Sequence, residues 1–259
     1  MSSCIRLLYT SVFLLVAAVP CVRAHIQGAP PSSVTRIARP LDDADRLYRN
    51  RAVIADAERA ASIWRDALAK DPRNFIVAWK LARAEYWLGG HASGDDTVRA
   101  AFERGMQAAR SAIAAAPDKP EGHFWLAANM AGLAETQGMR AGLRYRTLIR
   151  ESLERVLAID PAFQQGSADR ALGRWYYKVP GLFGGSKQKS ETHLRRALTY
   201  NPQSTVSHYF LAETLEAQGR HDDARAELRT VLDAPLDPEW APEDREWKDK
   251  ARAMLAQMK

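Results

Sequence analysis

The chain has 259 residues, which is enough for one large domain or two small ones with a substantial buried core. Hydrophobic residues make up 46% of it and charged residues 26%, so extensive disorder and collagen-like or low-complexity structure are excluded. The net charge of +6 is a mild excess. It argues against a nucleic-acid partner, because such proteins concentrate basic residues far more heavily on one face.

The first 24 residues have the pattern of an export signal. One positive charge lies in Met1–Arg6, an apolar run fills Leu7–Val19, and Val22-Arg23-Ala24 is a cleavage site of the V-x-A kind. The run is too short to cross a bilayer. We therefore expect cleavage after Ala24, a periplasmic or secreted protein, and no membrane span after cleavage. The alternative is a lipoprotein anchored at Cys21, although a proline stands where a small residue is normally required before that cysteine.

Both cysteines, Cys4 and Cys21, lie in this segment, so a mature chain beginning at His25 has neither a disulfide nor a thiolate metal site. Residues 25–40 are rich in Pro, Ser and Gly and show no helical period. This composition predicts a flexible linker.

Beyond the linker the sequence predicts a repeated pair of helices. Small or apolar residues recur five, eight and twelve positions before four prolines, on one face of a helix that the proline ends. The four sets are Ala67/Trp64/Ala60 before Pro72, Ala112/Ala109/Gly105 before Pro117, Val156/Leu153/Ile149 before Pro161, and Ala197/Leu194/Ser190 before Pro202. A Leu-Ala or Leu-Gly pair follows each proline and is expected to pack inward: Leu81-Ala82, Leu126-Ala127, Leu172-Gly173 and Leu211-Ala212.

The pattern resembles the tetratricopeptide repeat, W-x2-L-G-x2-Y…A-x3-F…P. We therefore predict an all-α fold, an α-solenoid of about five tetratricopeptide-like helix pairs over residues 41–235, with a C-terminal capping helix within residues 236–259. The cap is expected because a solenoid must cover its last repeat. Its apolar stripe consists of Trp247, Ala251, Met254, Leu255 and Met258.

Three longer blocks carry a closer resemblance: residues 122–139 (GHFWLAANMAGLAETQGM), 168–187 (ADRALGRWYYKVPGLFGGSK) and 236–252 (LDPEWAPEDREWKDKAR). Together they resemble exported bacterial proteins of the TRAP-transporter T-component (TatT) type. The HFWLA and LGRWYY segments are also similar to the repeat domain of the regulator-of-microtubule-dynamics family. The first resemblance implies a periplasmic helper that docks a substrate-binding protein, with an apolar channel between its helices.

The chemical motifs are weak. The segment Gly184-Gly185-Ser186-Lys187 is similar to a phosphate-binding loop but lacks its last glycine, its hydroxyl residue and a preceding strand. It is either an anion-binding loop or a turn in which Ser186 caps the next helix. No histidine spacing indicates zinc and no nucleophile motif occurs, so we expect no catalytic residue, no metal and no cofactor. His123 and His208 occupy equivalent repeat positions, which favours a shared packing role.

A run of arginines, Arg140, Arg144, Arg146 and Arg150, accompanies Met139, Leu143 and Leu148. It is interpreted as a solvated basic helix, with contact to anionic lipid as the alternative.

The first helix of each pair is expected to line a concave groove. The candidate residues for a partner-binding groove are Trp79, Arg83, Tyr86, Phe124, Arg170, Arg174, Tyr177, Tyr209 and Glu213. Aromatic residues interleaved with arginines suit an acidic peptide or a C-terminal carboxylate. The alternative is that the aromatic residues pack between helix pairs.

The sequence thus favours a non-catalytic scaffold that binds a protein or peptide, such as a periplasmic substrate-binding protein. A carrier or conduit for an apolar small molecule is the alternative function. Self-association into a homo-oligomer is left open.

Overall fold

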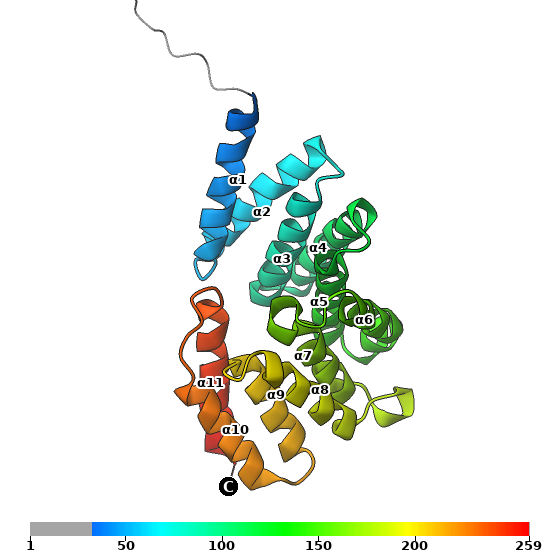
Figure 1. Ribbon diagram of the computed structural model, residues 1–259, viewed down its shortest axis with the longest axis vertical. Coiled ribbons are helices and arrows are strands. Elements are labelled where there is room, and N and C mark those ends of the chain that lie inside the picture. Colours follow the sequence, from blue (N-terminus) through cyan, green and yellow to red (C-terminus); the bar gives the residue numbers. More distant parts are fainter. Residues whose placement is uncertain (1–32, 259) are drawn as a thin grey trace, which may run out of the picture.

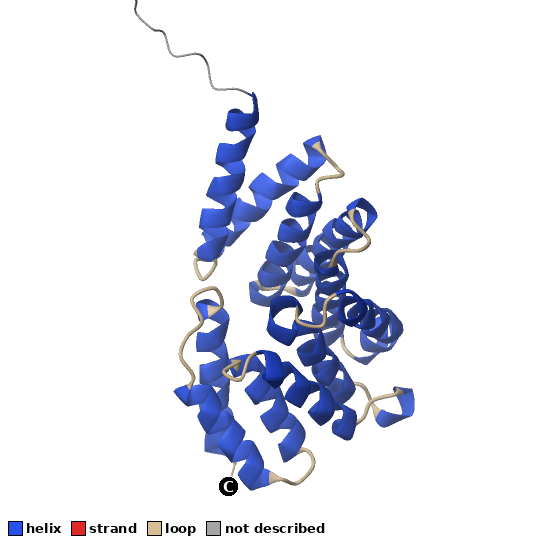
Figure 2. Ribbon diagram, viewed as in Figure 1, coloured by secondary structure: helices blue, strands red, loops and turns tan. Residues whose placement is uncertain are grey.

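The computed structural model of the protein describes residues 33–258, so the predicted export signal, its cleavage site and Cys21 lie outside the described residues. This part of the chain consists of helices and loops and has no strand (Figure 1, Figure 2). The elements are α1 Ser33–Arg49, α2 Ile54–Lys70, α3 Phe75–His91, α4 Asp95–Ala115, α5 Pro120–Gln137, α6 Met139–Ile159, α7 Phe163–Lys178, the 3-10 turn η1 Gly181–Phe183, α8 Lys187–Tyr200, α9 Thr205–Glu216, α10 His221–Asp233 and α11 Ala241–Gln257. None of these helices combines the length and apolar character needed to cross a bilayer.

The helices form five consecutive pairs, α1–α2 to α9–α10, and α11 follows them. This confirms the predicted all-α solenoid. The second helix of every pair ends two residues before a proline: Pro72, Pro117, Pro161, Pro202 and Pro235. A proline disfavours helical backbone in the residue before it and has no N–H to donate, so it stops each second helix at the same place in the repeat.

The predicted inward face of the second helices is confirmed. All twelve positions are buried except Ala67, which is half-buried. The one polar member, Ser190, is completely buried and shares a hydrogen bond of 2.9 Å with the hydroxyl of Thr214. On the first helices, Leu81, Leu172 and Leu211 are buried as predicted, but Leu126 is only half-buried. Leu126 still packs against the main core, so its predicted inward packing is confirmed only in part.

The predicted linker over residues 25–40 also requires correction, because α1 begins at Ser33. Pro40, which the sequence analysis placed at the end of the linker, lies inside this helix and is exposed. A proline within a helix leaves a carbonyl of the preceding turn without its backbone donor. At an exposed position water can supply that hydrogen bond, so the helix tolerates the proline.

The capping helix does more than cover the last repeat. Its predicted apolar stripe packs on α9 and α10, with Ala251 completely buried. Its N-terminal end reaches the opposite end of the solenoid, next to the loop between α1 and α2 (Figure 1). The helix pairs therefore form a closed ring, which the sequence analysis did not predict.

Arg51, in the loop after α1, makes the contacts that close the ring. Its side chain is 4% exposed and donates to the carboxylate of Glu243 (Nε to Oε1, 2.9 Å) and to the carbonyl of Glu239 (2.6 Å). The indole N–H of Trp87 on α3 donates to the Arg51 carbonyl at 2.9 Å. Beside it, His91 Nε2 lies 2.8 Å from a carboxylate oxygen of Glu246. We call these contacts between the first two repeats and α11 the clasp.

Candidate functional site

The ring turns its first helices, α3, α5, α7 and α9, and the cap α11 toward one another, and charged groups on them interact across the ring. Tyr86 on α3 interacts electrostatically with Glu135, Glu243 and Arg170, which belong to α5, α11 and α7. We call this set of helix faces the inner surface. It contains most, but not all, of the predicted groove residues.

Phe124 is the exception. It is 8% exposed and packs edge-on against Trp125 and Phe163 with ring centroids 5.1 and 5.6 Å apart. Its predicted place in the groove is wrong, and the alternative interpretation, packing between helix pairs, is correct at this position. The physical reason is that α5 has an aromatic-rich neighbour on each side, so its aromatic residues are enclosed.

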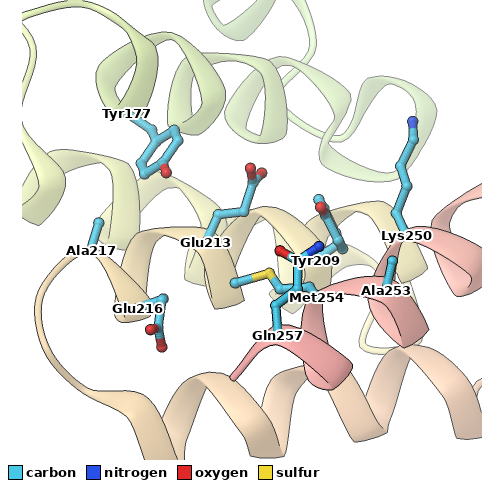
Figure 3. A pocket seen from close by; sticks show the side chains of 9 residues that line it. All are labelled: Tyr177, Tyr209, Glu213, Glu216, Ala217, Lys250, Ala253, Met254 and Gln257. Carbon is cyan, nitrogen blue, oxygen red and sulfur yellow. The ribbon is translucent and has the colours of Figure 1, made fainter. Parts of the chain in front are cut away.

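Three predicted groove residues, Tyr177, Tyr209 and Glu213, line one hollow between α7, α9 and the C-terminal end of α11 (Figure 3). The hollow has a volume of about 420 Å³. Its other lining residues are Glu216, Ala217, Lys250, Ala253, Met254 and Gln257. Charged side chains from α9 and α11 thus form a large part of its wall, beside two tyrosines and a methionine.

Arg174, next to this hollow, is already neutralised by the protein itself. Its guanidinium pairs with Glu213 on α9 and, at 3.5 Å, with Glu135 on α5, and it lies 4.5 Å from the centre of the Phe210 ring. The expectation that Arg174 is free to hold a partner's carboxylate is therefore wrong. Glu135 on α5 and Glu213 on α9 both reach Arg174 on the inner surface. The spacing of residues within α7 does not reveal these contacts from other helices.

Arg170, one helical turn before Arg174, has no ion pair or hydrogen bond with the side chains and backbone groups that the structure describes. Burial lowers the pKa of Arg170 to about 10, although the charges of Tyr86 and Asp244 act in the opposite direction. The guanidinium remains protonated at neutral pH but lacks a compensating partner. A half-buried guanidinium without a carboxylate partner attracts an anion through charge-assisted hydrogen bonds.

Tyr86, on α3, lies close enough to Arg170 on α7 for the two groups to interact electrostatically. Its ring packs against Trp125 at 5.8 Å and Phe102 at 6.2 Å, and 40% of the residue remains exposed. Desolvation of the hydroxyl, followed by the charges of Glu135 and Glu243, raises the pKa of Tyr86 to about 12. The hydroxyl therefore stays protonated and able to donate a hydrogen bond near Arg170.

The remaining predicted groove residues, Trp79 and Arg83, form a separate aromatic and cationic group with Tyr48. The Arg83 guanidinium lies 4.3 Å from the Tyr48 ring centre and 5.1 Å from that of Trp79, and it approaches Glu239 at 3.8 Å. The indole N–H of Trp79 and Nε of Arg83 are buried without a hydrogen-bond partner in the described part of the chain. These donors mark a second polar spot on the inner surface.

The loop Gly184–Lys187 is a well-bonded turn. Gly184 adopts a positive φ of 102°, and the N–H groups of Gly185 and Ser186 donate to the Pro180 and Tyr176 carbonyls. Ser186 caps α8 by accepting from the N–H of Lys189, as the turn interpretation predicted. The Lys187 ammonium donates to the Ala217 carbonyl at 2.7 Å. Because these donors are used within the chain, the geometry favours the turn over an anion-binding loop.

The repeated histidines have the shared structural role that was predicted. His123 Nε2 lies 3.0 Å from the Pro117 carbonyl, and His208 Nε2 lies 2.9 Å from the Pro202 carbonyl. Each ring thereby ties the start of a first helix to the proline turn before it. Across the described residues, no group of three or more His, Cys, Asp or Glu side chains could hold a metal ion.

Two buried carboxylates were missed by the sequence analysis. Glu85 on α3 is completely buried and pairs with Arg65 on α2 and Arg104 on α4, at 2.7 and 2.8 Å. Asp169 on α7 is likewise completely buried and pairs with His193 and Arg196 on α8. An acidic residue on the apolar face of a first helix was the available signal. Each carboxylate joins a first helix to the second helices beside it, so both belong to the scaffold.

Comparison with known proteins gives two family matches. The profile described as "Regulator of microtubule dynamics protein 1-3" covers residues 41–183, and a tetratricopeptide-repeat profile covers residues 188–242. "Regulator of microtubule dynamics protein 3" of Xenopus laevis is 26% identical over 148 residues, or 57% of this chain. The chain spans about 30% of that relative's length.

Solved structures share the fold. TTC0263, a tetratricopeptide protein of the thermophile Thermus thermophilus, matches with a TM-score of 0.64 and 20% identity, covering 85% of this chain and 99% of that one. PilW, a type IV pilus biogenesis factor, matches with a TM-score of 0.51 and 18% identity, covering 85% and 92%. At such identities the likeness establishes the tetratricopeptide fold and nothing further.

Proposed function

The chain belongs to the regulator of microtubule dynamics protein 1-3 family, and we propose that it is a non-catalytic scaffold that binds an acidic segment or C-terminal carboxylate of a partner protein at Arg170. The resemblances to the regulator-of-microtubule-dynamics family and to the tetratricopeptide repeat are confirmed. Tetratricopeptide solenoids present a concave surface for binding proteins and peptides.

The observation that carries the proposal is the contrast between two arginines on α7. Arg174 is neutralised by two glutamates, whereas Arg170 faces the same inner surface without a carboxylate partner in the described chain. A carboxylate entering the ring would find one uncompensated guanidinium and, near it, the Tyr86 hydroxyl as a second donor. Charge-assisted hydrogen bonds of this kind are short and strong, and Arg forms them in a bidentate geometry.

A panel of fluorescently labelled peptides tests this proposal. Peptides ending in two acidic residues and a free carboxylate are titrated into the wild-type protein, Arg170→Ala and the control Arg155→Ala. Arg155 is an exposed arginine on α6, outside the inner surface. We expect Arg170→Ala to weaken binding at least tenfold, equivalent to about 1.4 kcal/mol, and the control to leave it unchanged. Equal affinity for wild type and Arg170→Ala would contradict the proposal.

The alternative function, a carrier for an apolar small molecule, requires an apolar lining. The hollow at α9 includes Glu213, Glu216 and Lys250 in its wall, which favours a polar ligand or a peptide. Native mass spectrometry of the purified protein separates the two functions, since a carrier would retain a lipid or another apolar ligand.

Two narrower parts of the proposal rest on the sequence. Export to the periplasm or outside the cell is supported by the apolar run Leu7–Val19 and the V-x-A site ending at Ala24. The mass of the protein recovered from cells tests it: a chain beginning at His25 supports export, and a diacylated Cys21 would indicate an anchored lipoprotein. The role of uptake helper is supported by the three blocks similar to TRAP-transporter T-components. Binding of a purified periplasmic substrate-binding protein is its test.

A further inference from the structure

The turn between α7 and α8 projects from the outer side of the ring (Figure 1, yellow-green) and carries the most exposed large apolar side chain of the described residues. Leu182 is 89% exposed at its tip, and the adjacent Phe183 is 37% exposed. A single exposed leucine is common on protein surfaces. A leucine and a phenylalanine together at the tip of a projection are less usual, and they leave apolar surface in water.

Backbone hydrogen bonds and a close approach at Gly185 hold the turn in this conformation. The Phe183 and Gly185 N–H groups both donate to the Pro180 carbonyl, at 2.8 and 3.2 Å. A Cβ on Gly185 would lie 1.6 Å from the Val179 carbonyl oxygen, so only glycine fits there. With the chain closed on itself in this way, the apolar tip cannot fold back onto the protein without breaking the turn.

Basic residues flank the turn in the sequence, and no acidic residue lies among them. Residues 136–150 and 170–190 contain no Asp or Glu. The α6 segment lies against the turn, because the Arg146 guanidinium stands 5.6 Å from the Phe183 ring centre and the Arg146 carbonyl accepts from the Trp175 indole at 2.9 Å. Apart from Lys187, whose ammonium donates to the Ala217 carbonyl, the exposed cations of these segments are Arg144, Lys178 and Lys189. None of them forms an ion pair with the described part of the chain.

We propose that Leu182, Phe183 and these basic residues form a docking surface for a bilayer that contains anionic phospholipid. The apolar tip enters the boundary between headgroups and acyl chains, and the cations contact lipid phosphates. A projecting apolar tip suits a deformable bilayer, since protein partners usually receive such a side chain in a preformed pocket. The site lies on the outer side of the ring and is independent of the proposed peptide site at Arg170.

Flotation of the purified protein with vesicles tests this proposal. Vesicles of phosphatidylcholine alone are compared with vesicles containing 30% phosphatidylglycerol, a fraction of about one third chosen to give a clearly negative surface. We expect at least tenfold tighter binding to the anionic vesicles, falling as salt is raised. An apolar N-terminal segment, if retained, would add binding to both vesicle types, so the ratio between them is the readout.

Leu182→Ser with Phe183→Ser should reduce binding to the anionic vesicles at least tenfold. The matched control is Ile76→Ser, which alters an apolar side chain that is 50% exposed on α3, away from the turn. Leu182→Gln alone serves as a second variant, because a side chain so exposed contributes little to folding. Lys178→Glu with Lys189→Glu should abolish the preference for anionic lipid.

Arg170→Ala should bind vesicles like the wild type, which keeps this proposal distinguishable from the peptide site. Absence of a preference for anionic vesicles in the wild type would overturn the docking surface. So would unchanged vesicle binding by both Leu182 variants.

Discussion

The first helices of the third and fifth repeats carry nearly the same five residues but bury different ones. In α5 the sequence is HFWLA, the two aromatic residues are buried, and Leu126 is half-buried. In α9 the sequence is HYFLA, Leu211 is completely buried, and the two aromatic residues are half-buried. The motif alone therefore specifies a helix with a strongly apolar side, without specifying which residue faces the core.

The neighbouring helices explain the difference. The α5 helix stands between α3 and α7, and Trp125 packs on Tyr86 while Phe124 packs on Phe163. The α9 helix belongs to the last pair, and both of its aromatic residues pack against Trp247 of the cap, with ring centroids 5.1 Å apart. Aromatic neighbours on two sides enclose the rings of α5, whereas the cap leaves the rings of α9 partly open to the inner surface.

Substitution of the two leucines tests this comparison with the largest expected effect. Leu211→Asp should destabilise the protein by about 4 kcal/mol or more, because it removes a buried side chain and places an unpaired charge in the core. Leu126→Asp should cost less than about 2 kcal/mol, because water already reaches that position. Urea unfolding of both variants measures the difference. Equal destabilisation would mean that α5 has the same register as α9.

The clasp joins the two ends of the ring, and its removal shows whether they depend on each other. Burial raises the pKa of Glu243, although the Arg51 guanidinium acts to lower it. Burial acts to lower the pKa of Arg51, but the contact with Glu243 raises it overall. The attraction between the two groups therefore offsets only part of the free-energy cost of burying the Glu243 carboxylate. We expect Arg51→Ala to cost about 2 kcal/mol and to expand the molecule in solution scattering. Hydrogen exchange should rise at the start of α11. Arg59→Ala, with a side chain 70% exposed, is the control and should change neither measurement.

Asp169 links the fourth repeat's two helices, since it lies on α7 and pairs with α8. Burial tends to raise its pKa, but hydrogen bonds from His193 and Arg196 lower it below the ordinary value of 3.8. Its contribution to stability is therefore present above pH 3.8 and is lost as the pH falls through the lowered value. Asp169→Asn should cost about 1 kcal/mol at neutral pH, since Arg196 is half exposed, and should reduce the loss of stability in acid. Asp118→Asn, at an exposed turn, should leave the acid dependence unchanged.

The repeated histidines give the smallest effect. Both bond a proline carbonyl, but His208 also bonds Glu227. Burial would lower the pKa of His208, yet these hydrogen bonds raise it above 6.5 overall. Its contribution is thus complete below pH 6.5 and is lost as the pH rises through the raised value. The melting temperature should fall by a few degrees between about pH 6 and 8.5.

Replacing each histidine by glutamine distinguishes the contribution of His208 from that of His123. His208→Gln should remove part of this dependence on pH, and His123→Gln should leave it intact. The dependence of the melting temperature on pH that remains in His208→Gln is expected from His91, whose pKa is raised by its hydrogen bond to Glu246. A larger effect of His123→Gln than of His208→Gln would reverse the comparison.

The sequence by itself determined the helices, their pairing and much of the core. Prolines stop five helices at one position of the repeat, Ser186 starts α8, and the apolar positions before each proline are buried with one partial exception. These features depend on backbone hydrogen bonds and on the helical period within a few residues, which is why a single sequence reveals them. Most of the groove residues, selected by the same period, lie on the inner surface.

Tertiary structure alone decided the closure of the ring, the burial of Phe124 and the difference between Arg170 and Arg174. Each depends on residues far apart in the chain: Arg51 meets Glu243, and Glu135 and Glu213 meet at Arg174. The angle between successive pairs follows from the volumes of the side chains between them, and small rotations accumulate over five repeats. Whether the two ends meet, and which arginine remains without a partner, therefore follows from packing across the whole ring.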